Sequence, residues 1–366
     1  AYDLSACLVG SEMCIRDRIF TVDCGTLSFD AIDYAFNNDI DVIVLDHHQS
    51  EIKLPSAFSV VNPNRFDDKS NLQYLCAAGV SFMFLVSLNK QLRLKNWFKE
   101  KNVIEPDLLN YLDLVSLGTV CDVVQLKGLN RAFVKEGIGV ISRNSRLGIE
   151  ALKSISGSKD IGVTELGYRI GPRINAAGRT GASDLGFRLL TSDSEDEVLA
   201  ISERLNNLNK QRQNIEETVL FEAVNNIEDN VSNKKLNSFP NSLIAIGENW
   251  HLGVLGIVAS RIKDKYYRPS FVISDIEGKL TGSARSISGI DVGKLIIKGV
   301  NKKLLLSGGG HKMAAGFSLN HNTFESFKDF CDEEVYLQSN STSLNKISYY
   351  DEIIDSSNIC LLYTSD

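Results

Sequence analysis

Aspartate and histidine side chains follow two short apolar runs in the first part of the chain. Asp23 comes directly after the run IFTV, and the triplet Asp46, His47 and His48 comes directly after the run VIVL. The carboxyl ends of neighbouring strands in a parallel α/β sheet meet at one edge, where they line a ligand crevice, so we expect these groups to converge. Carboxylate oxygens and an imidazole nitrogen suit Mn²⁺ or Mg²⁺ better than they suit a thiolate-binding ion.

The same positions allow a second interpretation. A single aspartate after a strand commonly caps the helix that follows it. Two adjacent histidines have no packing reason to follow an apolar strand, which favours a functional site.

Asp122 interrupts the small and apolar residues of LVSLGTVCDVVQL. Burying an unpaired carboxylate costs roughly several kcal/mol, so either a cation or the cap of the next turn is expected to neutralise it.

Three further segments combine small residues with groups that bind phosphate. Arginine matches phosphate oxygens with a two-pronged guanidinium, and small residues let a ligand approach the backbone. We interpret GSARS as a tight polar loop and SGGGH as a glycine-rich loop whose amides could form an anion nest, although each could also be an ordinary turn. The candidate residues are Arg173, Asn175 and Arg179 in GPRINAAGR, Ser283 and Arg285 in GSARS, and His311 in SGGGH.

The composition indicates a globular protein with an uneven charge distribution. Apolar residues make up 43% of the 366-residue chain and charged residues 23%, and no apolar run reaches the ~18 residues of a membrane helix. The seven scattered cysteines contain no CxxC pair, which fits a reducing compartment. The net charge of −7 argues against a polyanionic partner, but residues 261–312 carry eleven Lys and Arg against four Asp and Glu. A basic region of this kind fits either a nucleic-acid groove or a solvated face.

The elements that position these groups alternate between strands and helices. Two buried strands, Ile19 to Val22 and Val42 to Leu45, flank a helix and predict a βαβ unit with a parallel sheet. Mainly helical sequence follows, and a long polar helix with a thin apolar stripe is expected to bridge two domains. We expect 1–18 to be non-native sequence, 19–190 a first domain, 191–232 the connecting helix and linker, 233–335 a second α/β domain, and 336–366 a linker and the start of an incomplete module.

In this order, the segments resemble one known family. TVDCG, DHH, LGTVCDVV and GPRINAAGR are similar to the RecJ branch of the DHH phosphoesterases, while WHLGVLGIVASRI, YRPSFVIS, GSARS and GGGHKMAAGF resemble the associated DHHA1 domain. The similarity covers roughly residues 19–320. It implies an α/β fold in which a parallel-sheet DHH domain is joined by a long helix to a smaller α/β DHHA1 domain.

The resemblance also implies roles for the candidate residues. Asp23 would bridge two Mn²⁺ or Mg²⁺ ions, and His47 and Asp122 would complete the shell of one ion. His48 would face the scissile phosphate, with Asp46 orienting the histidines. The remaining candidates would bind substrate: Arg173, Asn175 and Arg179 the nucleic-acid backbone, Ser283 and Arg285 the 5′ phosphate, and His311 the same cleft.

Three departures from the family pattern accompany the resemblance. The family begins with an Asp-rich strand motif that supplies further metal ligands, and that strand would lie before Ile19, in the segment we expect to be non-native. An oligonucleotide-binding fold would follow the DHHA1 domain, and only its start would be present. Gln125 stands where the family usually has proline.

The function implied is 5′-to-3′ hydrolysis of single-stranded DNA to mononucleotides by a cytoplasmic, two-metal exonuclease without a membrane anchor. A helicase and a single-strand-binding protein would be its partners. One rival is a DHH–DHHA1 phosphodiesterase that acts on short RNA or cyclic dinucleotides. The other is a nucleic-acid-binding fragment that lacks the first metal motif and does not catalyse.

Overall fold

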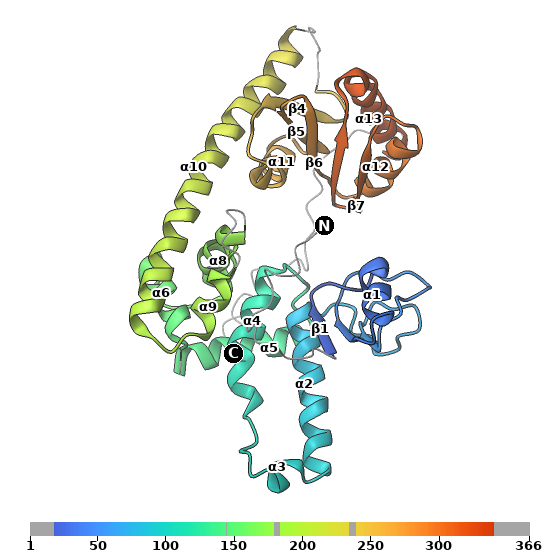
Figure 1. The fold of residues 1–366 in the computed structure, drawn as a ribbon. Helices are drawn as coiled ribbons and strands as arrows, with labels where there is room; N and C mark the ends of the chain where they lie inside the picture. Colours follow the sequence, from blue (N-terminus) through green and yellow to red (C-terminus); the bar gives the residue numbers. More distant parts are fainter. Residues whose placement is uncertain (1–17, 144, 179–183, 234–238, 340–366) are drawn as a thin grey trace, which may run out of the picture. The chain divides into compact units, whose positions relative to one another are not determined.

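The computed structural model describes residues 18–143, 145–178, 184–233 and 239–339 of the chain. They belong to two compact α/β units that divide between Lys210 and Gln211, inside a long helix (Figure 1). None of the described helices is both long enough and apolar enough to span a membrane.

The first unit contains a parallel sheet of three strands in sequence order. Strand β1 (Arg18–Val22) pairs with β2 (Asp41–Leu45), which pairs with β3 (Ser59–Val61), and α1 (Phe29–Phe36) connects the first two strands. The βαβ unit predicted from the sequence is therefore confirmed. Because all three strands run in the same direction, their carboxyl ends lie at the same edge of the sheet.

The prediction that β1 is buried is wrong. Its residues alternate between exposed and half-buried, and Phe20 and Val22 are 51% and 57% exposed. Among the described residues, β1 has a neighbouring strand only on its β2 side, which leaves its other side exposed. β2, with a strand on each side, is buried along most of its length.

Helices make up the rest of the first unit and pack around two apolar clusters. They are α2 (Ala77–Leu94), α3 (Trp97–Glu100), η2 (Leu108–Tyr111), α4 (Leu112–Cys121), α5 (Gly128–Arg143), α6 (Leu147–Ser156), α7 (Val163–Glu165), the π-helical turn η3 (Leu166–Ile170), α8 (Gly171–Gly178) and α9 (Leu185–Thr191). Among them, α2 and α4 extend toward the carboxyl edge of the sheet, so that the residue after α4 reaches the strand ends.

A single helix, α10 (Glu195–Asn233), belongs to both units. Its first half packs Val198, Ile201 and Leu205 into a core cluster of the first unit. Its second half packs Val219 and Ala223, with Ile227, into a core cluster of the second unit. The thin apolar stripe on a polar helix therefore has two different partners along its length, which confirms the predicted bridging helix.

The second unit contains a mixed sheet of five strands in the order β4-β5-β6-β8-β7. β4 and β5 are parallel, and the remaining pairs are antiparallel. The elements are β4 (Leu243–Glu248), α11 (Leu252–Tyr266), β5 (Ser270–Ile276), β6 (Lys279–Arg285), α12 (Val292–Asn301), β7 (Ser307–His311), β8 (Ala314–Leu319), η4 (His321–Thr323) and α13 (Phe324–Gln338).

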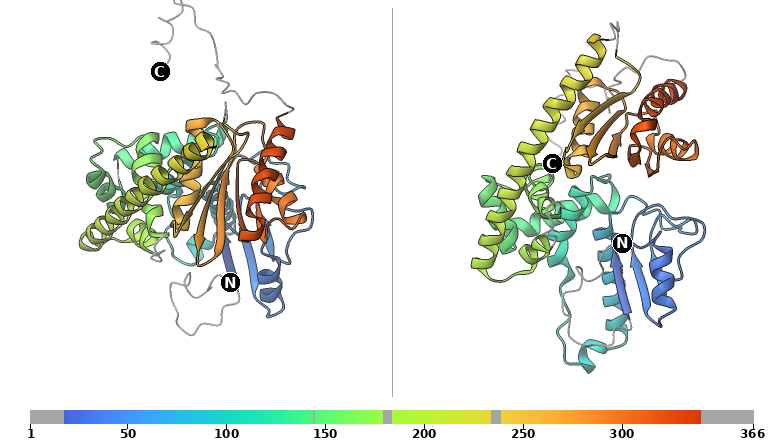
Figure 2. Two further views of the ribbon diagram at one scale, coloured as in Figure 1. Left: turned by 90° about the horizontal axis from the view of Figure 1, so that it is seen from above. Right: turned by 45° about the horizontal axis from the view of Figure 1, so that its top comes forward.

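Helices cover this sheet from both sides (Figure 2). Phe271 and Ile273 of β5 pack in one cluster with residues of α12 and α13, whereas Val272 between them packs with residues of α10 and α11. This alternation is the period of two expected of a strand buried on both faces.

Two segments predicted to be loops are strands instead. Most of GSARS forms the end of β6, and SGGGH forms β7. In β6 the buried Gly282 and Ala284 alternate with the half-buried Ser283 and Arg285. The small residues thus face the core while the polar residues face α11. This alternation is the period of a strand, and the glycine and serine content of the segment does not indicate it.

Candidate metal centre

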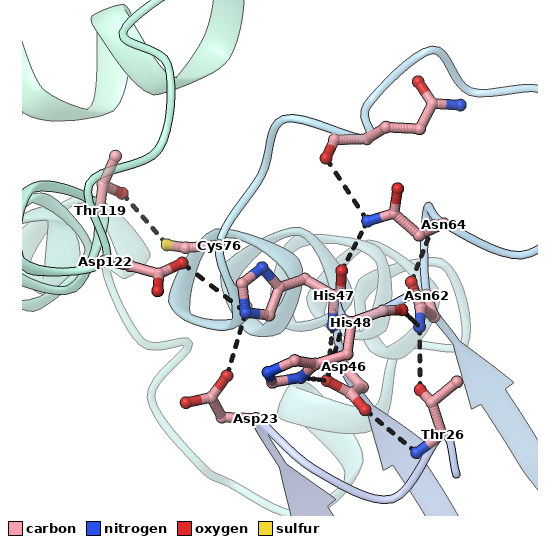
Figure 3. A network of polar contacts seen from close by, with 11 residues as sticks. Asp23, Thr26, Asp46, His47, His48, Asn62, Asn64, Cys76, Thr119 and Asp122 are labelled. Carbon is pink, nitrogen blue, oxygen red and sulfur yellow. Dashed lines mark hydrogen bonds and ion pairs between the residues drawn. The ribbon is translucent and has the colours of Figure 1, made fainter. Parts of the chain in front are cut away.

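His47 lies between two carboxylates at the carboxyl edge of the parallel sheet (Figure 3). Its Nε2 atom is 3.2 Å from Oδ1 of Asp23 and 3.6 Å from Oδ2 of Asp122. Asp23 follows β1, His47 follows β2, and Asp122 caps the carboxyl end of α4. The structure therefore brings together the three side chains for which the resemblance implies metal ligation.

Backbone geometry fixes two of these carboxylates. The amide of Asp23 donates to the carbonyl oxygen of Leu45 at 3.0 Å, and Asp23 has a left-handed φ of 61° that turns the chain sharply at the strand end. The amide of Asp122 donates to the carbonyl oxygen of Gly118 at 3.0 Å. The next residue, Val123, has a left-handed φ of 56° and is 87% exposed. A left-handed conformation is strained for a β-branched residue, and such strain clusters at functional sites.

Asp46 is the buried anchor of the centre, with a relative exposure of 1%. Its Oδ1 accepts the amide of His47 at 2.7 Å and that of His48 at 3.2 Å, and it also contacts Nδ1 of His48 at 2.7 Å. Its Oδ2 accepts the amide of Thr26 at 3.0 Å. Burial raises the pKa of Asp46, but the hydrogen bonds from Thr26 and His48 outweigh it and hold the pKa well below the usual range.

His48 is oriented by this contact. Its Nδ1 carries the proton shared with the Asp46 carboxylate, so its Nε2 is the atom directed away from Asp46. Burial lowers the pKa of His48, but the hydrogen bond that it donates to Asp46 and the negative charges of Asp46, Asp23 and Asp122 raise it above its ordinary value. A histidine with a raised pKa close to an acidic centre is suited to contact a phosphate oxygen.

Two asparagines support the DHH loop and were not identified from the sequence. Asn62 is 4% exposed and donates to Oγ1 of Thr26 and to the carbonyl oxygen of His48, both at 2.8 Å. Asn64 donates to the carbonyl oxygen of His47 at 2.5 Å. The available signal was their position directly after β3, at the same sheet edge as Asp23 and Asp46.

The donor set fits a hard divalent cation. Burial raises the pKa of Asp122, and the nearby charge of Asp23 raises it further, although His47 opposes this change. Two carboxylates that face one imidazole nitrogen repel each other, and a cation between them would relieve that repulsion. Oxygen and imidazole ligands suit Mn²⁺ or Mg²⁺.

His48 offers an alternative third donor. Asp23, His47 and His48 have ligand atoms within 4.8 Å of one another, the only such group in the part of the chain that the structure describes. Asp122 approaches His47 from another side and lies outside this group. Nδ1 of His48 is already committed to Asp46, so only its Nε2 is left to act as a donor.

A recess of about 480 Å³ adjoins the centre. Asp23 and Asp122 line it together with small side chains from α2 and α4, and Asn175 of α8 completes the lining. Helix α8 approaches α4 closely at Gly171, where a Cβ atom would lie 2.4 Å from Sγ of Cys121. Asn175 thus lines the same recess as the two carboxylates.

Arg173 of GPRINAAGR does not line this recess. Arg173 donates through Nε to Oδ1 of Asn206 at 3.0 Å and through Nη1 to the carbonyl oxygen of Arg169 at 2.6 Å. Burial and the charge of Arg169 lower its pKa. Arg173 thus lies half-buried between α8 and α10, and Arg179 lies outside the described residues.

The second unit brings its three candidate residues to one face of its sheet. Arg285 of β6 pairs with Ala314 of β8, which pairs with His311 of β7, so the side chains of this row point to the same side. Ser283 is two residues before Arg285 and shares this face, where its Oγ accepts Nη1 of Arg285 at 3.2 Å. His311 is exposed.

Comparisons with known proteins agree with this division of the chain. Residues 5–119 match the model of the DHH family, N-terminal domain, and residues 239–336 match that of the DHHA1 domain. The single-stranded-DNA-specific exonuclease RecJ of Salmonella typhimurium is 37% identical over 323 residues, which cover 87% of this chain and 56% of that protein. RecJ of Thermus thermophilus is 35% identical over 312 residues, covering 85% and 42%. The chain thus spans about half the length of these relatives.

Solved structures of RecJ are also similar to this chain. The crystal structure of Thermus thermophilus RecJ in complex with Mn²⁺ matches with a TM-score of 0.76 and 31% identity, covering 95% of this chain and 49% of that one. A structure of exonuclease RecJ bound to manganese matches with a TM-score of 0.69 and 32% identity, covering 90% of this chain and 78% of that one.

Proposed function

The chain belongs to the RecJ-type family, which joins a DHH domain to a DHHA1 domain, and from this we propose that it is a 5′-to-3′ exonuclease that hydrolyses single-stranded DNA to mononucleotides. The observation that supports this proposal most strongly is the convergence of Asp23 and Asp122 on Nε2 of His47. The names of the relatives supply the substrate class, because they are single-stranded-DNA-specific exonucleases.

Asp23, His47 and Asp122 hold the cofactor in this proposal, and the solved relatives contain Mn²⁺ or Mg²⁺. Two divalent cations, when bound, lower the pKa of a water molecule and neutralise charge on the reacting phosphate. These three side chains would hold one ion, and the carboxylate of Asp23 would also contribute to a second.

His48 and Asp46 orient the reacting phosphate. Asp46 fixes the imidazole of His48 through Nδ1 and fixes the backbone of the loop through two amides. The Nε2 atom of His48 then donates a hydrogen bond to a phosphate oxygen and stabilises the charge that develops on that oxygen in the transition state. Asp46 acts through His48 and does not touch the substrate.

The remaining candidates bind the strand without reading its bases. Asn175 lies in the recess beside the carboxylates, where it contacts the backbone next to the scissile bond, and Arg173 and Arg179 contribute positive charge in the same segment. In the second unit, Ser283 and Arg285 hold the 5′ phosphate and His311 lies on the same sheet face. Backbone contacts of this kind are tolerant of sequence.

The proposed substrate suggests a cellular location and two partner proteins. A single DNA strand as substrate supports a cytoplasmic location. A helicase and a single-strand-binding protein are the partners that would expose and coat such a strand.

A digestion assay tests the proposal. The chain is incubated with Mn²⁺ and a long 5′-phosphorylated single strand, the same strand in a blunt duplex, or a dinucleotide. We expect mononucleotides to be released from the 5′ end of the single strand, with little release from the duplex. Faster hydrolysis of the dinucleotide would favour a phosphodiesterase for short substrates, and Mn²⁺ binding without any hydrolysis would indicate a non-catalytic fragment.

A further inference from the structure

Helix α11 contacts the phosphate-binding pair Ser283 and Arg285 through a glycine. If Gly256 carried a Cβ atom, that atom would lie 2.7 Å from Nη2 of Arg285 and 3.1 Å from Oγ of Ser283. Both distances are shorter than ordinary van der Waals contact, so any side chain at position 256 would displace the arginine. The guanidinium of Arg285 therefore occupies the space that the missing side chain leaves.

We propose that Gly256 is a positioning residue that holds the guanidinium of Arg285 where it binds the 5′ phosphate of a single strand. This inference rests on the proposed function of Arg285. The guanidinium is held on its other side by its own strand, because Nη1 donates to Oγ of Ser283 at 3.2 Å and to the carbonyl oxygen of Ala284 at 2.9 Å. The guanidinium therefore has α11 on one side and its own strand on the other.

The sheet beside this arginine is open. Ser283 pairs with Gly316 of β8, which pairs with Gly309 of β7, so these positions form one row on the face that carries Arg285. A Cβ atom built on either glycine would have no atom within 4 Å. We call Gly309 and Gly316 the glycine floor. Next to the floor, Arg285 and His311 stand two strands apart, about 10 Å, which leaves room for the end of a strand between them.

The atoms that Gly256 faces distinguish this role from ordinary helix packing. At Gly137 and Gly148 of the first unit, a Cβ atom would lie 2.2 and 2.1 Å from carbonyl oxygens of Leu112 and Leu189. Those carbonyls belong to packed backbone, so a side chain there would force elements apart. At Gly256 the nearest atom is the end of a flexible side chain, so an alanine is accommodated by moving Arg285. The alanine therefore weakens binding of the 5′ phosphate. It also stabilises the folded chain by about 1 kcal/mol, because alanine has the higher helix propensity.

The experiment measures binding of the full chain to a short fluorescent oligodeoxythymidylate that carries either a 5′ phosphate or a 5′ hydroxyl. For Gly256→Ala we expect the preference for the 5′ phosphate to fall about 10- to 100-fold, as for the loss of a charged hydrogen bond, with an unchanged or slightly higher melting temperature. Gly139→Ala is the matched control. Gly139 is also within a helix and its Cβ atom would also approach an arginine, 3.2 Å from Nη1 of Arg143, but it lies on α5, to which the proposal assigns no contact with the strand.

Arg285→Ala distinguishes the phosphate-binding role of Arg285 from the positioning role of Gly256. We expect it to lose the preference for the 5′ phosphate, and we expect Gly256→Ala to add no further loss in the Arg285→Ala background, because both changes remove the same contact. If Arg285→Ala lost the preference and Gly256→Ala kept it, the positioning role would be wrong and the proposed function would stand. If Arg285→Ala itself kept the preference, the assignment of Arg285 would be wrong. A Gly256→Ala chain that failed to fold would also contradict the positioning role.

Discussion

The metal centre of the first unit and the glycine floor of the second unit are constructed in opposite ways. The metal centre gathers charged side chains at strand ends and fixes them with hydrogen bonds to one buried carboxylate, Asp46. The face that carries the glycine floor uses missing side chains, at Gly256, Gly309 and Gly316, to leave space around one arginine. Substitutions should therefore impair the first region by removing atoms and the second by adding them.

The largest effect is expected from His47→Ala in the metal centre. The imidazole is the group that both Asp23 and Asp122 approach, so its removal leaves two carboxylates without their shared partner. We expect Mn²⁺ affinity and the cleavage rate to fall more than about 100-fold. This exceeds the loss that follows when a residue that only hydrogen-bonds to a metal ligand is changed. Calorimetry and digestion of a single strand measure the two quantities, and substantial cleavage by the variant would refute the assignment.

Asp46→Asn should have the next largest effect, about 10- to 100-fold on cleavage. The amide keeps the shape but turns donor hydrogens toward the backbone amides that the carboxylate accepted, so His48 loses its fixed orientation. Asp113→Asn is the control, because Asp113 is equally buried and pairs with Arg146 away from the centre. Both variants should lose stability in urea, but only Asp46→Asn should lose activity. Equal activity losses would mean that Asp46 acts only through the fold.

Gly316→Val tests the second region by adding atoms to the glycine floor. Valine suits a strand, and the position has open space for a Cβ atom, so the sheet should remain folded. We expect single-strand affinity to fall about tenfold, since small displacements of a bound backbone have effects of that size or more, while Mn²⁺ affinity stays unchanged. An unchanged strand affinity in an anisotropy titration would show that the strand does not cross β8.

Val123→Gly should have the smallest effect on Mn²⁺ binding, and it should stabilise the chain where the Asp46 and Asp113 variants destabilise it. Val123 is exposed and left-handed directly after Asp122, and glycine relieves a strain of about 1 kcal/mol. We expect a slightly higher urea midpoint with weaker Mn²⁺ binding, because the strain fixes the direction of Asp122. Lys303→Gly, at another exposed left-handed position, should stabilise the chain without changing Mn²⁺ binding. Stronger Mn²⁺ binding by Val123→Gly would contradict the link between strain and the centre.

The convergence of Asp23 with the DHH triplet was predictable from the sequence. Asp23 and the DHH triplet follow apolar runs, and the rule that parallel strand ends share an edge was sufficient to bring them together. The convergence of Asp122 could be expected only through the family resemblance, because a residue after a helix has no such rule.

Features that depend on contacts between distant segments were not predictable. The support of the DHH loop by Asn62 and Asn64 requires β3 to lie beside β2 in a particular register. The strand conformation of GSARS and SGGGH depends on β8 as their shared partner, since glycine-rich sequence by itself favours turns. The exposure of β1 follows from its having, within residues 18–143, a neighbouring strand only on its β2 side.

A crystal of the chain grown with Mn²⁺, with diffraction recorded at the manganese absorption edge, tests the central claim most directly. We predict an anomalous peak about 2 Å from Nε2 of His47, with carboxylate oxygens of Asp23 and Asp122 at similar distances. Anomalous density elsewhere, with these three side chains left in contact only with each other or with water, would contradict the assignment of the centre.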